Sequence, residues 1–166
     1  SKIEAGKLEL EATLFRPDQL ANRVQELFSV SAEEKGLELD IFVSGRADIQ
    51  RVGDPHRLLQ ILQNLISNAI KFTHEGEVTV TFSCTPGKPF GIEVCDTGIG
   101  MTEAQTSRIF NAFEQADGSV TRRFGGTGLG MSIVARLVSI MNGTIKVQST
   151  PTVGTTIQIL LPLEEA

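Results

Sequence analysis

The sequence lacks the features that mark several classes of protein. Its longest run of basic residues is the pair Arg122-Arg123, and the formal net charge is −5. Nucleic-acid surfaces are normally basic, so we expect no binding to DNA or RNA. No apolar stretch approaches the roughly 20 residues of a membrane-spanning helix, and no signal peptide opens the chain. We therefore expect a cytoplasmic location, which is compatible with a parent protein anchored in the inner membrane.

Cysteine and the common nucleotide-binding motifs are also scarce or absent. The only cysteines are Cys84 and Cys95, and their spacing does not suggest a zinc site. Two unpaired thiols fit a reducing compartment. Strand alternation places Cys84 on the same face as Phe82 and Cys95 on the face opposite to Val94. Neither GxxxxGK[ST] nor GxGxxG occurs, which excludes a P-loop, a dinucleotide fingerprint and a protein-kinase glycine loop.

The 166 residues, of which 40% are hydrophobic, fit one globular domain. Hydrophobic periodicity predicts helices over residues 17–35, 54–73 and 130–141. Strands are expected over residues 7–15, 37–43, 77–82, 91–95, 144–149 and 155–161. Regular strand–helix alternation is absent, so a doubly wound parallel sheet is not expected. The order favours an α+β fold, a two-layer α/β sandwich whose mixed, antiparallel-rich sheet carries helices on one face.

The predicted helix over residues 54–73 has an unusual polar face. Most such faces are simply solvated, but asparagine is a poor helix former, and Asn64 and Asn68 lie four residues apart. An amide oxygen is a suitable ligand for Mg²⁺, and Lys71 can meet a phosphate. Both readings, a solvated face and a ligand-binding face, stay open on these residues alone. At 100° per residue the face comprises Arg57, Gln60, Asn64, Asn68 and Lys71.

Two glycine-rich motifs lie at the two ends of an aperiodic stretch, residues 96–128. The first, Asp96-Thr97-Gly98-Ile99-Gly100, follows a predicted strand. Its aspartate can accept a hydrogen bond from an exocyclic amine, and its glycines can let the backbone approach a flat ligand; a tight turn would also explain it. The second, residues 125–130, runs into a helix, where free N–H groups bind phosphate. A flexible hinge is the alternative.

Together, these motifs resemble the histidine kinase ATPase family, a branch of the superfamily shared with gyrase, mismatch-repair and heat-shock chaperone ATPases. The match covers essentially the whole chain, and residues 1–8 are similar to the junction that leaves the phosphoacceptor helices. The sequence of residues 113–117 looks especially like that of hybrid sensor kinases. Residues 64–73 look like the asparagine box, 96–100 like the first glycine box, 110–115 like the phenylalanine box, 125–130 like the second glycine box and 154–156 like the last.

This resemblance implies a Bergerat-type ATP-binding fold over residues 17–166, after a linker and edge strand over residues 1–16. It implies ATP and Mg²⁺ as ligands, with Asn68 and Asn64 as metal ligands and Asp96 on the adenine amine, helped by Thr155 through water. Residues 102–128 would form a lid. The implied catalytic residues are Asn68, Lys71, Arg122 and Arg123. The implied nucleotide-binding residues are Asn64, Asn68, Lys71, Asp96, Gly98, Gly100, Met101, Phe113, Gly126, Thr127, Gly128, Leu129, Gly130 and Thr155.

One departure from the family pattern bears on the chemistry. Hydrolytic relatives carry a glutamate base where this chain has Asn64, and a carboxamide cannot take a proton at neutral pH. We therefore expect a sensor histidine kinase catalytic domain that donates the γ-phosphoryl of ATP to a histidine on a separate stem. The alternatives are a degenerate nucleotide-binding module and a gyrase-type hydrolase.

The same resemblance implies the partners. They would be the phosphoacceptor dimerisation domain of the same kinase and, through the parent protein, the receiver domain of a response regulator. The fragment itself is expected to be monomeric. Its histidines, His56 and His74, are expected to have ordinary surface roles.

Overall fold

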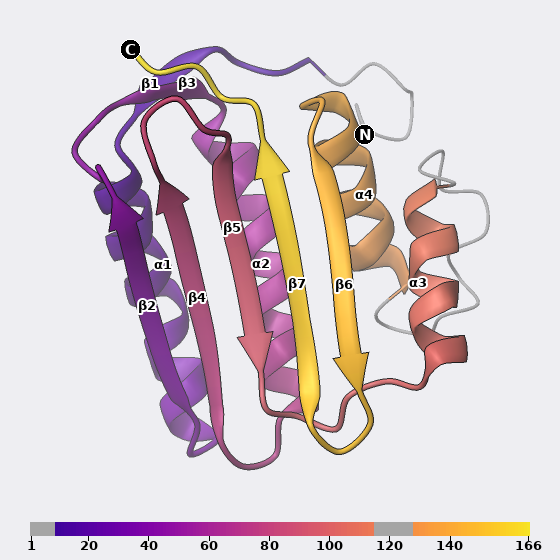
Figure 1. The fold of residues 1–166 in the computed structure, drawn as a ribbon. Coiled ribbons are helices and arrows are strands. Elements are labelled where there is room, and N and C mark those ends of the chain that lie inside the picture. Colours follow the sequence, from indigo (N-terminus) through magenta and orange to yellow (C-terminus); the bar gives the residue numbers. More distant parts are fainter. Residues whose placement is uncertain (1–8, 115–127) are drawn as a thin grey trace.

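The computed structural model describes residues 9–114 and 128–166, and these residues form four helices and seven strands (Figure 1). The helices are α1 (Pro17–Glu34), α2 (Pro55–Phe72), α3 (Glu103–Glu114) and α4 (Gly128–Ile140). The strands are β1 (Thr13–Phe15), β2 (Glu38–Gly45), β3 (Arg51–Gly53), β4 (Glu77–Cys84), β5 (Phe90–Asp96), β6 (Thr144–Thr150) and β7 (Gly154–Leu161).

Five strands form the main sheet, in the order β2-β4-β5-β7-β6, while β1 and β3 pair separately. Only the β2–β4 pair in the main sheet is parallel. Figure 1 shows α1, α2 and α4 behind one face of the sheet, with α3 beside β6 and α4. The predicted two-layer sandwich with a mixed, antiparallel-rich sheet is therefore confirmed. Among the described residues, no helix is both long and apolar enough to cross a membrane.

The core lies between α2 and the centre of the sheet. Along β4, Val78, Val80 and Phe82 are fully buried at every second position, because successive side chains of a strand point to opposite faces. The apolar stripe of α2 faces them. Burying one such side chain contributes roughly 1.5–3 kcal/mol relative to leaving it exposed. The buried residues of α2 are Leu58, Ile61, Leu62, Leu65, Ile66, Ala69 and Ile70.

Both ends of α2 are fixed by polar contacts. At its start, the side chain of Asp54 accepts hydrogen bonds from the backbone N–H of Arg57 at 3.2 Å and of Glu11 at 3.0 Å. At its end, the ammonium of Lys35 donates to the carbonyls of Ile70 and Lys71 at 2.6 and 2.8 Å. A cation there satisfies free carbonyls and favours the negative end of the helix dipole. These contacts tie both ends of α2 to neighbouring segments of the chain.

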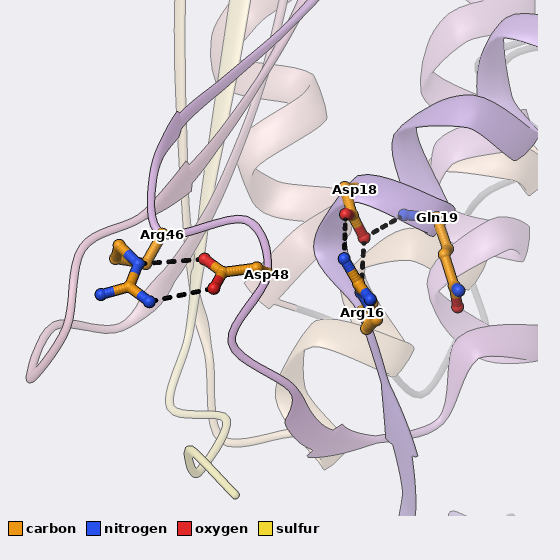
Figure 2. Close-up of polar contacts among 5 residues, drawn as sticks. All are labelled: Arg16, Asp18, Gln19, Arg46 and Asp48. Carbon is orange, nitrogen blue, oxygen red and sulfur yellow. Dashed lines mark hydrogen bonds and ion pairs between the residues drawn. The ribbon is translucent and has the colours of Figure 1, made fainter.

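The ends of α1 and β2 carry two exposed ion pairs, drawn in Figure 2. Arg16 binds Asp18 through two hydrogen bonds of 3.0 and 2.6 Å, and Arg46 binds Asp48 through two of 3.0 and 2.9 Å. Asp18 also accepts a hydrogen bond from the N–H of Gln19. The hydrogen bond from Arg46 is the main reason that the pKa of Asp48 falls to about 2. Because both pairs face solvent, they contribute little to stability.

Two local predictions differ from the structure, and two elements were not predicted. The strand expected over residues 7–15 is limited to Thr13–Phe15 in the described chain, and it pairs with β3 instead of the main sheet. Glu11 lies outside the strand, and its N–H donates to the side chain of Asp54 instead of to a neighbouring strand. The three-residue β3 and the polar helix α3 were not predicted. Helix α4 begins at Gly128 instead of Gly130, so the second glycine motif supplies its first turn.

Candidate functional site

A cavity of about 350 Å³ opens between the C-terminal half of α2, the ends of β5 and β7, and the helix α3. Its walls are mainly apolar, with a few polar groups from different elements, which is the usual composition of a small-molecule site. Figure 1 shows the C-terminal end of α2 and the facing ends of β5 and β7 at one end of the sheet, with α3 beside β6. The lining residues are Leu65, Asn68, Ala69, Phe72, Val94, Asp96, Ile99, Gly100, Met101, Gln105, Arg108, Ile109, Met131, Thr155 and Ile157.

Among the described residues that line the cavity, Asp96 is the acidic one. Its Oδ1 accepts hydrogen bonds from the backbone N–H of Gly98 at 2.9 Å and of Thr155 at 3.2 Å. Within the described chain, Oδ2 accepts none. Burial raises the pKa of this carboxyl, and the two N–H donors oppose that rise. One oxygen is therefore fixed by the protein, and the other remains available to a ligand donor.

The hydroxyl of Ser149 joins three segments around the cavity. It lies 2.7 Å from the hydroxyl of Thr155, accepts a hydrogen bond from the N–H of Met101 at 2.8 Å and donates to the carbonyl of Gly154 at 3.1 Å. Thr155 and Met101 were predicted to belong to the site, whereas Ser149 was not. No sequence motif includes this serine. Its contact with Met101 joins residues far apart in the sequence.

Gly98 allows the segment after β5 to lie directly against the end of α2. A Cβ at this position would collide with the carbonyl oxygen of Phe72 and would lie 2.8 Å from Oγ1 of Thr73. The N–H of Ile99 donates to the same Phe72 carbonyl at 3.1 Å. The hydroxyl of Thr73 is buried there and has no hydrogen-bond partner among the described residues. The close approach that Gly98 permits is thus between two segments of the chain.

Gly100 has a similar role on the other side of this segment. Its φ of +66° lies in the left-handed region, which glycine adopts without steric cost. A Cβ here would collide with the carbonyl of Thr150. Next to it, the carbonyl of Ile99 accepts a hydrogen bond from the N–H of Thr152 at 2.7 Å. The first glycine motif is therefore held between α2 and the β6–β7 turn, which fixes Asp96 at the cavity.

The predicted polar face of α2 divides into two parts. Asn68 is half-buried and lines the cavity. Asn64 is outside the lining, and its Nδ2 donates to the Gln60 carbonyl at 2.9 Å. Arg57 donates to the side chain of Gln60 at 2.9 Å. Lys71 is exposed, with its ammonium 5.4 Å from the centre of the Phe72 ring. Of these five residues, Asn68 is the one that reaches the cavity.

Helix α3 supplies a wall that the sequence analysis missed. Gln105, Arg108 and Ile109 line the cavity. The helix begins with a capping box: the N–H of Thr102 donates to Oε1 of Gln105 at 2.9 Å, and the N–H of Gln105 donates to Oγ1 of Thr102 at 3.2 Å. This T-x-x-Q pattern is a known signal of a helix start. It could have identified α3 without hydrophobic periodicity.

Several predicted site residues lie where the structure gives less detail. Phe113 belongs to α3, and Gly128, Leu129 and Gly130 form the first turn of α4. The remaining predicted residues, Arg122, Arg123, Gly126 and Thr127, lie outside the described residues. The expected lid over residues 102–128 is described only for its first part, which is largely α3, and for Gly128.

Comparison with known proteins identifies the class to which this site belongs. The family described as "Histidine kinase-, DNA gyrase B-, and HSP90-like ATPase" matches residues 53–165. This chain therefore belongs to that family of ATPases. The match begins just before α2 and includes every residue that lines the cavity.

More specific similarities point to one branch of the family. The signal transduction histidine-protein kinase BarA of Escherichia coli strain K12 is 42% identical over 160 residues, which are 94% of this chain and 17% of BarA. Full-length ShkA, crystallised with AMPPNP, matches with a TM-score of 0.82 and 34% identity over 98% of this chain and 34% of ShkA. The chain thus corresponds to the ATP-binding catalytic region of sensor histidine kinases and spans less than a fifth of BarA.

A third comparison concerns the fold alone. The catalytic domain of the histidine kinase ThkA matches with a TM-score of 0.74 at 23% identity, over 92% of this chain and 95% of that domain. The near-complete coverage on both sides shows that the described sandwich is the architecture of such a catalytic domain. The family and the fold expected from the sequence are confirmed.

Proposed function

We propose that this chain binds Mg·ATP in the cavity and donates the γ-phosphoryl group to a histidine on a separate dimerisation stem. The observation that carries the proposal is the state of Asp96, whose Oδ1 is fixed by two N–H donors while Oδ2 faces no donor in the described chain. An adenine amine is a fitting donor for Oδ2. The apolar side chains of Val94 and Ile157 line the same cavity and suit the faces of a purine ring.

Magnesium would be held near Asn68. Among the described residues, Asp96 is the only carboxylate that lines the cavity, so a cation beside the phosphates would rely on amide and phosphate oxygens. Such hard oxygen ligands suit Mg²⁺, which usually keeps several waters. The amide of Asn64 uses its nitrogen on the Gln60 carbonyl, which leaves its oxygen for this purpose. When bound, Mg²⁺ would neutralise charge on the phosphates; Lys71, Arg122 and Arg123 are the further proposed phosphate contacts.

The chain's own residues can orient ATP but offer no base for hydrolysis. Asn64 stands where hydrolytic relatives have a glutamate, and a carboxamide cannot take a proton from water. The proposed role of the domain is therefore to hold ATP, shield it and present its γ-phosphorus. An imidazole is itself a nucleophile, so an acceptor histidine needs no base on this chain.

Neither histidine of the chain is placed to be that acceptor. His56 is exposed in the first turn of α2, about 18 Å along the helix axis from Asn68 at 1.5 Å per residue. His74 is exposed just beyond the end of α2, and neither residue lines the cavity. In-line attack requires contact between nucleophile and phosphorus at about 3–3.5 Å. The acceptor is therefore proposed to come from a stem outside this chain.

The test is phosphoryl transfer between separate proteins. The chain is incubated with γ-labelled ATP and Mg²⁺, alone and with a separately produced stem of the parent kinase. We expect no acid-labile label on the chain alone and label on the stem when both are present. A stem whose acceptor histidine is replaced by glutamine serves as the control. Rapid labelling of His56 or His74 would contradict the proposal, and fast phosphate release without a stem would favour a hydrolase. ATP binding without any transfer would indicate a degenerate module.

The proposed context follows the resemblance to sensor kinases. Residues 1–16 would link the catalytic domain over residues 17–166 to the dimerisation stem of the same kinase. The parent would be a hybrid kinase, and the phosphoryl group would pass from its acceptor histidine to the receiver domain of a response regulator. The domain itself would remain monomeric and work on the cytoplasmic side.

A further inference from the structure

We propose that Arg108 of α3 binds the phosphate chain of the nucleotide and so acts as a binding residue of this site. The proposal rests on the proposed function, because it needs a nucleotide in the cavity. No motif of the sequence analysis includes Arg108. The assignment arises from the placement of α3, which brings this side chain to the wall of the cavity.

The charge of the cavity suits a phosphate contact at Arg108. Among the described residues that line it, Arg108 is the sole cation and Asp96 the sole anion. The chain carries a net charge of −5, and the phosphates of ATP add several negative charges. If Asp96 receives the adenine amine, the phosphates must avoid this carboxylate and lie elsewhere along the wall. Arg108 offers them the opposite charge.

The guanidinium of Arg108 is also available to a ligand. In the described chain, Arg108 forms no hydrogen bond or ion pair, and its side chain is exposed. Gln105, one turn earlier on the same face, is already engaged in the capping box with Thr102. Lys71, the phosphate contact implied by the family resemblance, lies over the Phe72 ring and is outside the lining. Arg108 is therefore the lining cation without a structural task among the described residues.

The helix that carries Arg108 is held in place by the rest of the fold. The capping box determines where α3 begins, and the helix packs against α4 and β6. The neighbouring Ile109 is partly buried against the core and lines the same cavity. An arginine on a packed helix loses less freedom on binding than one on a loop. Its planar group can bind two phosphate oxygens at once.

The test compares ligands with and without phosphates on the same chain. Affinities for adenosine, AMP, ADP and Mg·ATP are measured by calorimetry for the unaltered chain, for Arg108→Gln and for Arg108→Lys. Arg23→Gln is the matched control, because Arg23 is an exposed helix arginine paired with Glu26 and outside the cavity lining. Melting temperatures of all variants establish that they fold equally well.

We expect Arg108→Gln to weaken Mg·ATP binding about tenfold, or about 1.4 kcal/mol, and to leave adenosine binding unchanged. The Mg·ATP affinity of Arg108→Lys should lie between those of the unaltered chain and Arg108→Gln, because lysine keeps the charge but loses the bidentate contact. An equal loss for adenosine and ATP would overturn the assignment, as would an effect no larger than that of Arg23→Gln. Failure of the unaltered chain to bind ATP would overturn the proposed function itself, and with it this inference.

Discussion

The substitution Asp96→Asn tests the adenine contact at the level of single atoms. It keeps the size of the side chain and leaves Oδ1 able to accept the hydrogen bonds from Gly98 and Thr155. The change falls on the other atom, where an amide nitrogen replaces Oδ2. A donor would then face the proposed adenine amine, which is also a donor. The local structure should survive, and only the ligand contact should be lost.

The loss can be sized from the strength of one hydrogen bond to a charged group, which is about 1.5–3 kcal/mol. Since 1.4 kcal/mol corresponds to a tenfold change, the affinity of Asp96→Asn for ATP should fall about 10- to 100-fold. GTP presents a carbonyl at the corresponding ring position, so its weak binding should fall less or improve. The preference for ATP over GTP should shrink accordingly.

The same substitution should have the opposite effect on the free domain. Burial raises the pKa of Asp96 above its ordinary value of 3.8, so the fold favours the protonated form. The protonated carboxyl therefore adds to the stability of the fold. This added stability is fully present below pH 3.8 and is lost as the pH rises through the raised pKa of Asp96. At neutral pH the ionised carboxylate is therefore a cost, and Asp96→Asn should melt at a higher temperature than the unaltered chain without nucleotide.

Calorimetry with ATP and GTP over a falling pH series, together with thermal melts, would test both parts. ATP affinity of the unaltered chain should weaken as Asp96 becomes protonated, whereas that of Asp96→Asn should not follow this titration. Asp48→Asn is the control, because it removes an exposed carboxylate that does not line the cavity. Unchanged ATP affinity in Asp96→Asn would refute the adenine contact. A lower melting temperature would refute the reasoning about burial.

Two further predictions concern the metal and the surface. Asn68→Ala should remove most of the Mg²⁺ dependence of ATP binding. The melting temperature should stay nearly unchanged, because Asn68 is only half-buried at the cavity wall. Titrations of ATP with and without Mg²⁺ check this, and an undiminished Mg²⁺ effect would contradict it. Arg46→Gln should return the pKa of Asp48 from about 2 towards 3.8, as measured by NMR of the carboxyl carbon. If the pKa of Asp48 stays near 2, the backbone hydrogen bond and not Arg46 would be the main cause of its low value.

The elements with strong periodicity could be predicted from the sequence. In α2 and β4, apolar residues repeat at the helical and strand periods, and the side chains expected to be inside are buried. The order of the elements found in this way predicted the class of the fold. These features depend on local patterns, which a single sequence displays.

Features that depend on contacts between distant segments could not be predicted in the same way. Helix α3 has a largely polar sequence, and its position against α4 and β6 brings Arg108 to the cavity. Ser149 is an ordinary strand residue until Met101 and Thr155 meet at its hydroxyl. Asn64 and Asn68 share a helix face, yet only the second lines the cavity, because the wall begins at Leu65.

The pairing of β5 with β7 has a consequence for folding in the cell. Asp96 lies opposite Thr155 in this register, and the N–H of Thr155 is one of the two donors that orient the carboxylate. A slip by one residue would turn the side chains of a strand to the opposite face, and the carboxylate would lose its orientation. A nucleotide that binds only the correct register adds its binding free energy to that state, about 2.7 kcal/mol at a concentration 100 times its Kd. Bound ATP would thus stabilise the one strand alignment in which its own binding site is complete.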